Sequence, residues 1–310
     1  MNGSEREILA GKRRFLHIRS RALRRIRAFF DGEGFLEVQT PVLTSAPAPE
    51  THIRTIAADG GRYLSTSPEL FMKRLLAAGY EKIYQISPAF RAGERGRLHH
   101  PEFTILEWYR SGADYRTLQD DCQRLVQSVC GALGPDCAPR RGDRALAAGG
   151  EWTRMSVREA CMEFAGWDPG PDPDEDRFDT VMVEKVEPNL GFPAPCILED
   201  YPAGRAALAR LKPGDPEVAE RFELYWAGIE LANGFSELTD PAEQRARFEA
   251  AIYLKQTREG VRPNMPEAFL ESLHNLGPCA GIAFGVDRFV MLLAGADDID
   301  SVTAFSPEMA

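Results

Sequence analysis

The sequence predicts an α+β fold in which helices pack on an antiparallel β-sheet, and two observations carry this prediction. The strand-like segments come in hairpins, one formed by 82–91 with 102–110 and another within 221–238. They also outnumber the strands that alternating strand–helix units of a parallel sheet would give. The 310 residues are 44% hydrophobic and 27% charged, which is ordinary for a globular protein. We expect a single domain over 1–310.

The helices are predicted from amphipathic spacing and from end signals. Within 12–31, apolar residues recur every three or four positions, and Gly32 follows the last turn. Ser67 and Pro68 open the next helix, because serine caps helices and proline fits their first turn. Further helices are expected at 115–132, 156–165, 241–257 and 286–295.

The strands are predicted from short apolar or alternating runs bounded by glycine and proline. In chain order we expect them at 35–43, 51–57, 62–66, 82–91, 102–110 and 281–285, with the 221–238 hairpin turning at Ala227-Gly228. The region 115–215 carries the weakest signal. Within it, the proline- and aspartate-rich segment 171–179 is a loop or the start of a helix.

Composition bounds the class of protein. No apolar run approaches the ~20 residues of a membrane helix, and the N-terminus lacks a signal-peptide core, so we expect a cytoplasmic protein without a membrane partner. The cysteines form no C-x-x-C pair and the histidines do not complete a zinc site. Buried reduced thiols are therefore expected at Cys122, Cys130, Cys137, Cys161, Cys196 and Cys279.

The charge distribution leaves two interpretations of the first helix open. The net charge of -10 weakens the case for a large nucleic-acid footprint. One local basic run nevertheless lies in the helix, at Lys12, Arg13, Arg14, Arg19, Arg21, Arg24, Arg25 and Arg27. It is either the solvated face of a helix or a docking surface for an acidic macromolecule.

The returning strand of the first hairpin carries chemistry on one face. Because side chains alternate along a strand, one face holds Phe103, Ile105, Glu107 and Tyr109. Two apolar residues followed by a carboxylate and a phenol predict a pocket floor whose far end holds a cation. The alternative is a salt bridge at a sheet edge.

The second hairpin concentrates carboxylates. If the chain turns at Ala227-Gly228, Tyr225 pairs with Glu230, and Glu223 faces the same side as Glu230. Two such close charges repel unless a cation lies between them, and Mg²⁺ prefers a few carboxylates together with phosphate oxygens. Glu237 follows on the same returning strand.

The junction GVDR at 285–288 predicts a phosphate-bearing ligand. Backbone N–H groups at a helix start favour an anion, and the preceding glycine lets a flat ligand approach the backbone. Arg288 in the first turn opposes the helix dipole unless an anion neutralises it.

In this order, these motifs resemble the catalytic core of the class II aminoacyl-tRNA synthetases, in particular the lysyl branch. FFDGEGFLEVQTPVLT resembles the first motif, FRAGERGRLHHPEFTILEWY the second and GIAFGVDRFVMLLAG the third. YLSTSPELFMKRLLAAG and FELYWAGIELANGFSELTDP match lysyl-type segments between them. The motifs span about 19–44, 82–110 and 280–295, and the resemblance covers about 12–308.

The resemblance implies activation of an amino acid by ATP and Mg²⁺. Arg91 would grip the α-phosphate and the attacking carboxylate, and Arg288 the terminal phosphate, so both are expected to be catalytic. Glu223 and Glu230 would hold Mg²⁺. The implied ATP-binding residues are Arg91, Gly93, Glu94, His99, His100, Phe103, Glu230, Leu231, Gly285 and Arg288.

The resemblance also implies an amino acid with two amino groups, as in lysine. Glu69 would bind the amino group near the carboxylate, and Glu107 with Glu237 the distal ammonium. The implied substrate-binding residues are Ser67, Glu69, Glu107, Tyr109, Asn233, Phe235, Glu237 and Ala283.

The position of the first motif refines the expectation. It starts within ~30 residues of the N-terminus, too few for the anticodon-binding barrel of a complete lysyl-tRNA synthetase. The chain therefore resembles the stand-alone paralogues that transfer (R)-β-lysine to a lysine ε-amine of elongation factor P. A homodimer is implied, and tRNA is not expected as an acceptor. Two alternatives are an enzyme acylating tRNA or a small amine, and a catalytically silent protein that binds lysine or uncharged tRNA.

Three positions depart from the pattern of the synthetases. Ala283 stands where glycine is usual, and its methyl group would disfavour an α-amino group and tolerate a β-amino group. Gly93 displaces the loop acid by one position, to Glu94. His100 replaces the usual asparagine, although histidine can still donate one hydrogen bond to ATP.

Overall fold

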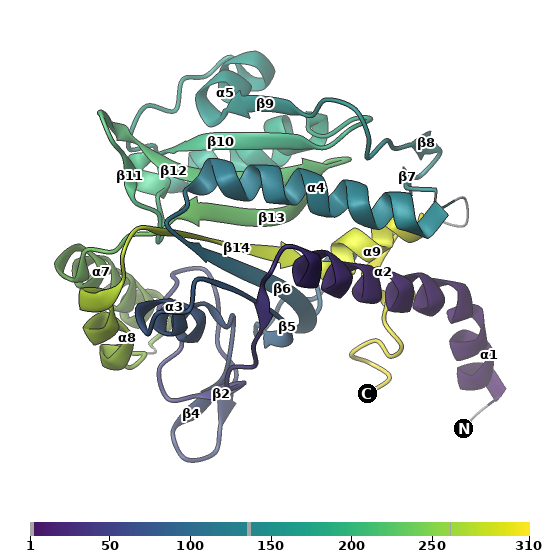
Figure 1. Ribbon diagram of the computed structural model, residues 1–310, viewed down its shortest axis with the longest axis horizontal. Coiled ribbons are helices and arrows are strands. Elements are labelled where there is room, and N and C mark those ends of the chain that lie inside the picture. Colours follow the sequence, from purple (N-terminus) through teal and green to yellow (C-terminus); the bar gives the residue numbers. More distant parts are fainter. Residues whose placement is uncertain (1–2, 135–137, 261) are drawn as a thin grey trace.

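The computed structural model describes residues 3–134, 138–260 and 262–310. Its centre is a nine-stranded sheet in the order β1-β5-β6-β14-β13-β12-β10-β9, with β11 joined to β12 (Figure 1). The strands are β1 Leu36–Glu37, β5 Lys82–Phe90, β6 Glu102–Ser111, β9 Thr153–Ser156, β10 Cys196–Pro202, β11 Leu211–Lys212, β12 Asp215–Trp226, β13 Ile229–Ser236 and β14 Cys279–Gly285.

The sheet is antiparallel in its centre, as predicted, and parallel at both ends. Strands β5, β6, β14, β13, β12 and β10 run alternately in opposite directions. The end strands β1 and β9 run parallel to β5 and β10. Each parallel partner enters through a long connection, whose course the local sequence pattern does not reveal.

The helices cover the sheet unequally. Their bounds are α1 Gly3–Gly11, α2 Arg13–Gly32, α3 Glu69–Ala77, α4 Tyr115–Leu133, α5 Val157–Ala165, α6 Glu175–Val181, α7 Pro241–Glu259, α8 Glu267–Ser272 and α9 Val286–Ala294. Short helical turns occupy 182–186, 187–189, 203–205, 273–275 and 299–302. Every predicted helix is present, whereas α1 and α8 were not predicted. Segment 171–179 is confirmed as a helix start, with Asp174 capping α6.

The main hydrophobic core lies between the sheet and helices α2, α4 and α9, which cross the sheet in Figure 1. Side chains such as Ile26, Leu106 and Phe284 are buried in it. The opposite face of β6 and β14 remains available for a cavity. Helices α3, α7 and α8 close one end of that face through a second core that includes Met72 and Phe269.

The predicted strand 35–43 is wrong in its middle. Only β1 and β2 (Leu43–Thr44) are strands, and they belong to different sheets. Between them the chain crosses from the large sheet to a three-stranded one formed by β2, β4 (Arg62–Leu64) and β3 (Ala57–Ala58). The backbone N–H of Thr40 is bound by the Gln85 side chain at 2.9 Å instead of by a strand. Segment 51–56 is likewise not a strand.

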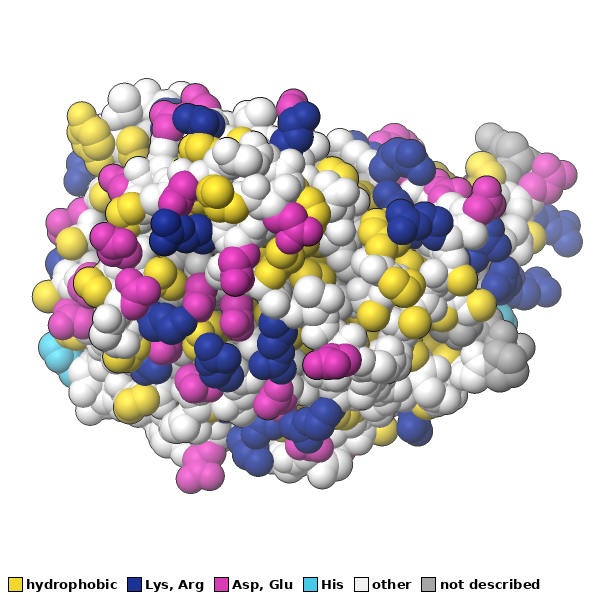
Figure 2. All heavy atoms as spheres, turned by 90° about the horizontal axis from the view of Figure 1, so that it is seen from above, with side chains coloured by type: hydrophobic (Ala, Val, Ile, Leu, Met, Phe, Trp, Pro, Cys, Tyr) yellow, Lys and Arg dark blue, Asp and Glu magenta, His cyan; other side chains and the backbone are white. Residues whose placement is uncertain are grey.

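Other expectations concern thiols and charges. Cys122, Cys161, Cys196 and Cys279 are buried free thiols and Cys130 is half-buried, whereas Cys137 lies outside the described residues. On the face shown in Figure 2, acidic and basic side chains are interspersed.

A small hairpin of β7 (Arg140–Arg141) and β8 (Arg144–Ala145) completes the fold. Across the described residues, no helix is both long and apolar enough to cross a bilayer.

Candidate active site

Four neighbouring strands bring the predicted substrate residues side by side. Glu107 lies opposite Ala283 on β14, and Ala283 lies opposite Asn233 on β13. Asn233 in turn lies opposite Glu223 on β12. The next row on the same face consists of Tyr109, Gly281, Phe235 and Arg221. Except for Glu223 and Arg221, these two rows form the floor of a cavity, which the start of α3, the loop 91–100 and the start of α9 enclose.

The start of α3 fastens the acidic end of this cavity. The Ser67 hydroxyl donates to Oε1 of Glu107 at 2.6 Å, and the Tyr109 hydroxyl donates to Oε2 at 2.8 Å. The backbone N–H of Glu69 donates to the Ser67 oxygen at 3.0 Å. Burial, with the nearby Glu69 charge, raises the pKa of Glu107 to about 8. A cation at this end would restore the ionised form of Glu107.

Glu237 lies beside Gly281 at the acidic end but is not among the residues that line the cavity. It is buried outside the cavity lining and forms an ion pair with Lys73, a residue that sequence reasoning did not single out. A Cβ added at Gly281 would collide with the Tyr109 ring and with Oε1 of Glu237. Because that Cβ would point to the same face of the sheet as Tyr109, the Glu237 oxygen lies on the cavity side of Gly281.

The opposite end of the cavity is rich in arginine. The Arg91 guanidinium lies over the Phe103 ring, with 5.0 Å between its central carbon and the ring centroid. Its Nη1 is 3.9 Å from Glu94, and its buried Nε has no hydrogen-bond partner among the described residues. An anion would satisfy that donor. Glu50, also not predicted, lines the cavity nearby, and burial, opposed by Arg91, raises its pKa to about 7.

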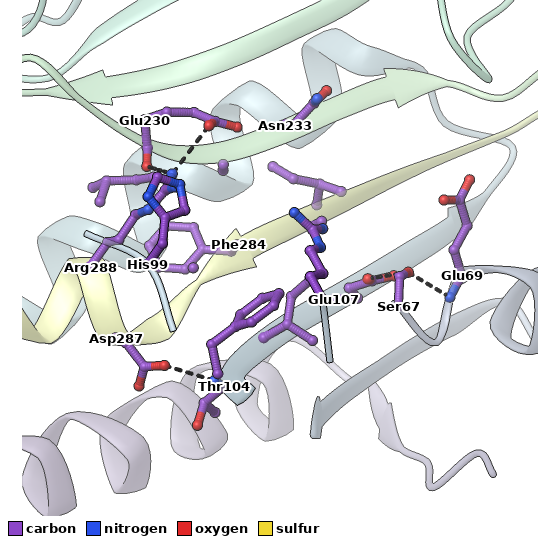
Figure 3. A pocket seen from close by; sticks show the side chains of 18 of the residues that line it. Ser67, Glu69, His99, Thr104, Glu107, Glu230, Asn233, Phe284, Asp287 and Arg288 are labelled. Carbon is purple, nitrogen blue, oxygen red and sulfur yellow. Dashed lines mark hydrogen bonds and ion pairs between the residues drawn. The ribbon is translucent and has the colours of Figure 1, made fainter. Parts of the chain in front are cut away.

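Arg288 is held in place by Glu230 of β13 and by His99 of the loop 91–100. Its Nη1 donates to the backbone oxygen of Glu230 at 2.8 Å and to the Glu230 carboxylate at 3.1 Å. Its Nη2 lies 2.5 Å from Nε2 of His99. Burial and the Arg288 charge lower the pKa of His99, so a neutral ring accepts this bond. Figure 3 shows Arg288, His99 and Glu230 together at one end, and Ser67, Glu69 and Glu107 at the other.

The predicted metal ligands lie on the same hairpin. Glu223 accepts hydrogen bonds from Arg221 at 2.7 Å and from the Tyr225 hydroxyl at 2.6 Å. Burial and the neighbouring Glu230 charge raise the pKa of Glu223. Within the described ranges, no group of three or more His, Cys, Asp or Glu residues is arranged to hold a metal ion. Two carboxylates alone leave most of a Mg²⁺ coordination shell to phosphate oxygens and water.

The structure sorts the predicted residues clearly. Gly93, Glu223 and Glu237 are not among the cavity-lining residues. Gly93 has a φ of 80°, a backbone conformation that favours glycine at this position of the loop. His100 does line the cavity, but its Nε2 lies 2.5 Å from a carboxylate oxygen of Asp300 and is therefore already paired. All other predicted site residues line the cavity: Ser67, Glu69, Arg91, Glu94, His99, Phe103, Glu107, Tyr109, Glu230, Leu231, Asn233, Phe235, Ala283, Gly285 and Arg288.

Comparisons with known proteins agree with this architecture. The family model described as tRNA synthetases class II (D, K and N) matches residues 10–309. Three curated relatives are named elongation factor P–(R)-β-lysine ligase. Those of Vibrio cholerae and Vibrio parahaemolyticus are each 41% identical, covering 93% and 94% of both chains, respectively. That of Hamiltonella defensa is 38% identical over 94% of both chains. The chain therefore belongs to the class II tRNA synthetase family, within the group that contains the elongation factor P–(R)-β-lysine ligases.

Proposed function

We propose that the protein activates (R)-β-lysine with ATP and joins it to the ε-amino group of a lysine of elongation factor P. The observation that carries this proposal is one cavity with two ends of opposite charge. Glu69 and Glu107 offer carboxylates to ammonium groups, and Arg91 with Arg288 offers guanidinium groups to phosphates. The names of relatives that match over nine-tenths of the chain supply the acceptor.

The reaction has two steps, and neither needs a covalent bond to the enzyme. The substrate carboxylate attacks the α-phosphorus of ATP, pyrophosphate leaves, and an aminoacyl-adenylate forms. The acceptor ε-amine then attacks the acyl carbon, AMP leaves, and an amide remains. Arg91 and Arg288 stabilise the negative charge on the phosphates, while the buried acidic end orients the amino acid.

The residues present fit a magnesium ion on the nucleotide. Glu223 and Glu230 are close enough for the Glu230 charge to raise the pKa of Glu223, a repulsion that a divalent cation relieves. When bound, Mg²⁺ would neutralise phosphate charge. Arg221 and Arg288 hold these two carboxylates in place.

The proposal is tested by the intact mass of elongation factor P after incubation with the protein, ATP, Mg²⁺ and either (R)-β-lysine or lysine. The expected result is a gain of one lysyl residue, formed faster with the β-isomer. An Arg91→Ala variant should lose both this transfer and ATP–pyrophosphate exchange, because the positive charge that stabilises the phosphates during activation is lost.

The acceptor is tested separately from activation. Pyrophosphate exchange without any gain in mass would contradict elongation factor P as acceptor and favour tRNA or a small amine. We expect negligible aminoacylation of tRNA in the same assay, because the chain carries a net charge of -10.

The assembly follows from the same assignment. We infer a homodimer that works in the cytoplasm, where translation factors are modified. The edge strand β1 supports the dimer, because its Leu36 side chain is 50% exposed, and Tyr80, in the connection before β5, is 44% exposed. Large exposed apolar side chains at a sheet edge favour contact with another chain.

A further inference from the structure

Lys73 is a charged side chain that the reaction described above does not use. It lies one helical turn after Glu69 on α3 and is completely buried. Its Nζ donates to Oε1 of Glu69 at 2.5 Å and pairs with Oε2 of Glu237. The same nitrogen lies 5.2 Å from the centroid of the Phe235 ring. A buried ammonium with such partners is part of a built ionic cluster, since an unpaired one would be very costly.

The contacts of Lys73 leave one oxygen of each carboxylate for another donor. Lys73 binds Oε1 of Glu69, and the rest of Glu69 lines the cavity. It binds Oε2 of Glu237, whereas Oε1 of Glu237 is buried and without a hydrogen-bond partner among the described residues. That oxygen lies next to the position that a Cβ on Gly281 would take, on the face of the sheet that lines the cavity. Lys73 thus holds both carboxylates at the acidic end of the cavity.

The charges also balance only when Lys73 is counted. Glu69, Glu107 and Glu237 can carry three negative charges at this end of the cavity, and Lys73 carries one positive charge. The sum of -2 matches an amino acid with two ammonium groups. Without Lys73, a third carboxylate would remain uncompensated in a buried site.

We propose that Lys73 is a built-in counter-ion of the amino-acid pocket, which positions Glu69 and Glu237 and sets the pocket's charge for a substrate with two ammonium groups. The proposal rests on the proposed function for the identity of the substrate. It makes Lys73 a positioning residue, because its ammonium acts through the two carboxylates. The other titratable or charged groups around the cluster are Glu50, Arg91, Glu107, Tyr109, Arg210, Lys255 and Cys279.

The first experiment measures ATP–pyrophosphate exchange with Lys73→Met, which keeps the length of the side chain and removes its charge. The KM for (R)-β-lysine should rise about tenfold or more, while kcat falls by less than about threefold. The acidic limb of the kcat/KM profile should move to higher pH by about one unit, since Lys73 lowers the pKa of Glu237. Lys73→Arg should bring both the KM and the pH profile part of the way back to those of the wild type. An unchanged KM and pH profile would overturn the proposal.

A second experiment uses the cavity that Lys73→Ala would leave. Propylammonium chloride should raise the Tm of this variant and lower its KM, whereas propanol and sodium chloride at equal concentration should do neither. The same amine should leave the wild type unchanged. Equal effects of propanol and propylammonium would show that only volume matters and would refute the counter-ion.

The two experiments separate this proposal from the proposed function. If the wild type activates neither lysine isomer, the proposed function fails. The Tm of Lys73→Ala with propylammonium still tests the counter-ion, because that measurement requires no amino-acid substrate. If Lys73→Met does not fold, the amine-dependent Tm of Lys73→Ala decides in the same way.

Discussion

At the scale of single residues, the buried carboxyl groups of Glu107 and Glu237 make the stability of the protein depend on pH. Burial raises the pKa of Glu107 to about 8, and the pKa of buried Glu237 is also raised to about 8, both from an ordinary 4.5. Between pH 4.5 and about pH 8, both carboxyl groups are still protonated in the folded chain but already ionised in the unfolded chain. Unfolding then releases protons, so the stability of the free protein falls as pH rises through this interval.

This linkage gives a measurable expectation. Between pH 5.5 and pH 8, the Tm of the free protein should fall by about 5 °C or more. Lysine should raise Tm more at pH 8 than at pH 6, because its ammonium groups bind the ionised carboxylates. Differential scanning calorimetry measures both effects. Glu107→Gln should flatten the first trend, and a Tm that rises steadily with pH would contradict the assignment.

Ala283 is the residue expected to tune the choice of isomer. Its methyl group lies in the floor of the cavity, between Glu107 and Asn233 on the neighbouring strands. Ala283→Gly removes that methyl group and should raise the use of lysine relative to (R)-β-lysine by about tenfold, the usual effect of one methyl group in a pocket. Pyrophosphate exchange with each isomer measures the ratio. An unchanged ratio would remove Ala283 from the account of specificity.

At the scale of elements, the hairpin of β12 and β13 directs the side chains of Glu230 and Asn233 into the cavity. Ala227 and Gly228 both have positive φ, 56° and 71°, as a tight two-residue turn requires. The predicted pairing of Tyr225 with Glu230 is confirmed. One extra residue then enters β13, so that Leu224 lies opposite Ala232. This bulge lets Glu230 and Asn233, three residues apart, both line the cavity.

Asp287 joins three elements at one buried carboxylate. It stands in the first turn of α9, pairs with Arg19 of α2, and accepts the backbone N–H of Thr104 in β6 at 2.7 Å. The three sequence motifs therefore meet at this residue. We expect Asp287→Asn to lower the free energy of unfolding by about 2–4 kcal/mol, because it leaves the Arg19 charge without its partner. Urea denaturation measures the change.

The matched control for this change is another aspartate that binds backbone N–H groups. Asp240 caps α7 by accepting from Ala242 and Glu243 at 2.8 and 2.9 Å. Asparagine caps helices as well as aspartate does, so Asp240→Asn should cost little. If Asp287→Asn were equally mild, the carboxylate would not connect the motifs energetically.

At the scale of the whole molecule, the exposed edge at β1 predicts self-association. Sedimentation equilibrium should give about twice the chain mass of 34.5 kDa. A Leu36→Lys/Tyr80→Lys variant should dissociate to monomers, because charge at an apolar contact opposes association. Met162→Lys is the control, since Met162 on α5 is similarly exposed at 51%. A monomeric wild type would refute the homodimer.

The basic run of α2 shows what the sequence pattern could and could not predict about charged side chains. Four of these basic side chains bind other residues of the same chain. Lys12 binds the Thr303 carbonyl, Arg19 binds Asp287, Arg21 binds the Leu133 carbonyl and Arg27 binds Glu37. The remaining members, Arg13, Arg14, Arg24 and Arg25, are exposed. Their availability for a dimer or an acidic partner stays a prediction, because helical periodicity cannot tell a solvated arginine from one that binds a distant residue.

The local pattern was sufficient for most of the helices, the two hairpins and most of the cavity lining. A helix buries one stripe of side chains with a period of 3.6 residues, and the side chains of a strand alternate with a period of two. Each element can therefore be predicted from a short run of consecutive residues. The order of the motifs then identified the family. For these reasons the sequence alone places Arg91, Glu107 and Arg288 in one site.

Only the tertiary structure decided the features that depend on residues far apart in the chain. Lys73 and Glu237 are paired although 164 positions separate them, as the difference between 237 and 73 shows. The division of 35–43 between two sheets and the place of Glu237 beside Gly281 depend on neighbours in the same way. Such choices follow from which charges are desolvated together and which strands find partners, and neither is encoded in a short stretch of sequence.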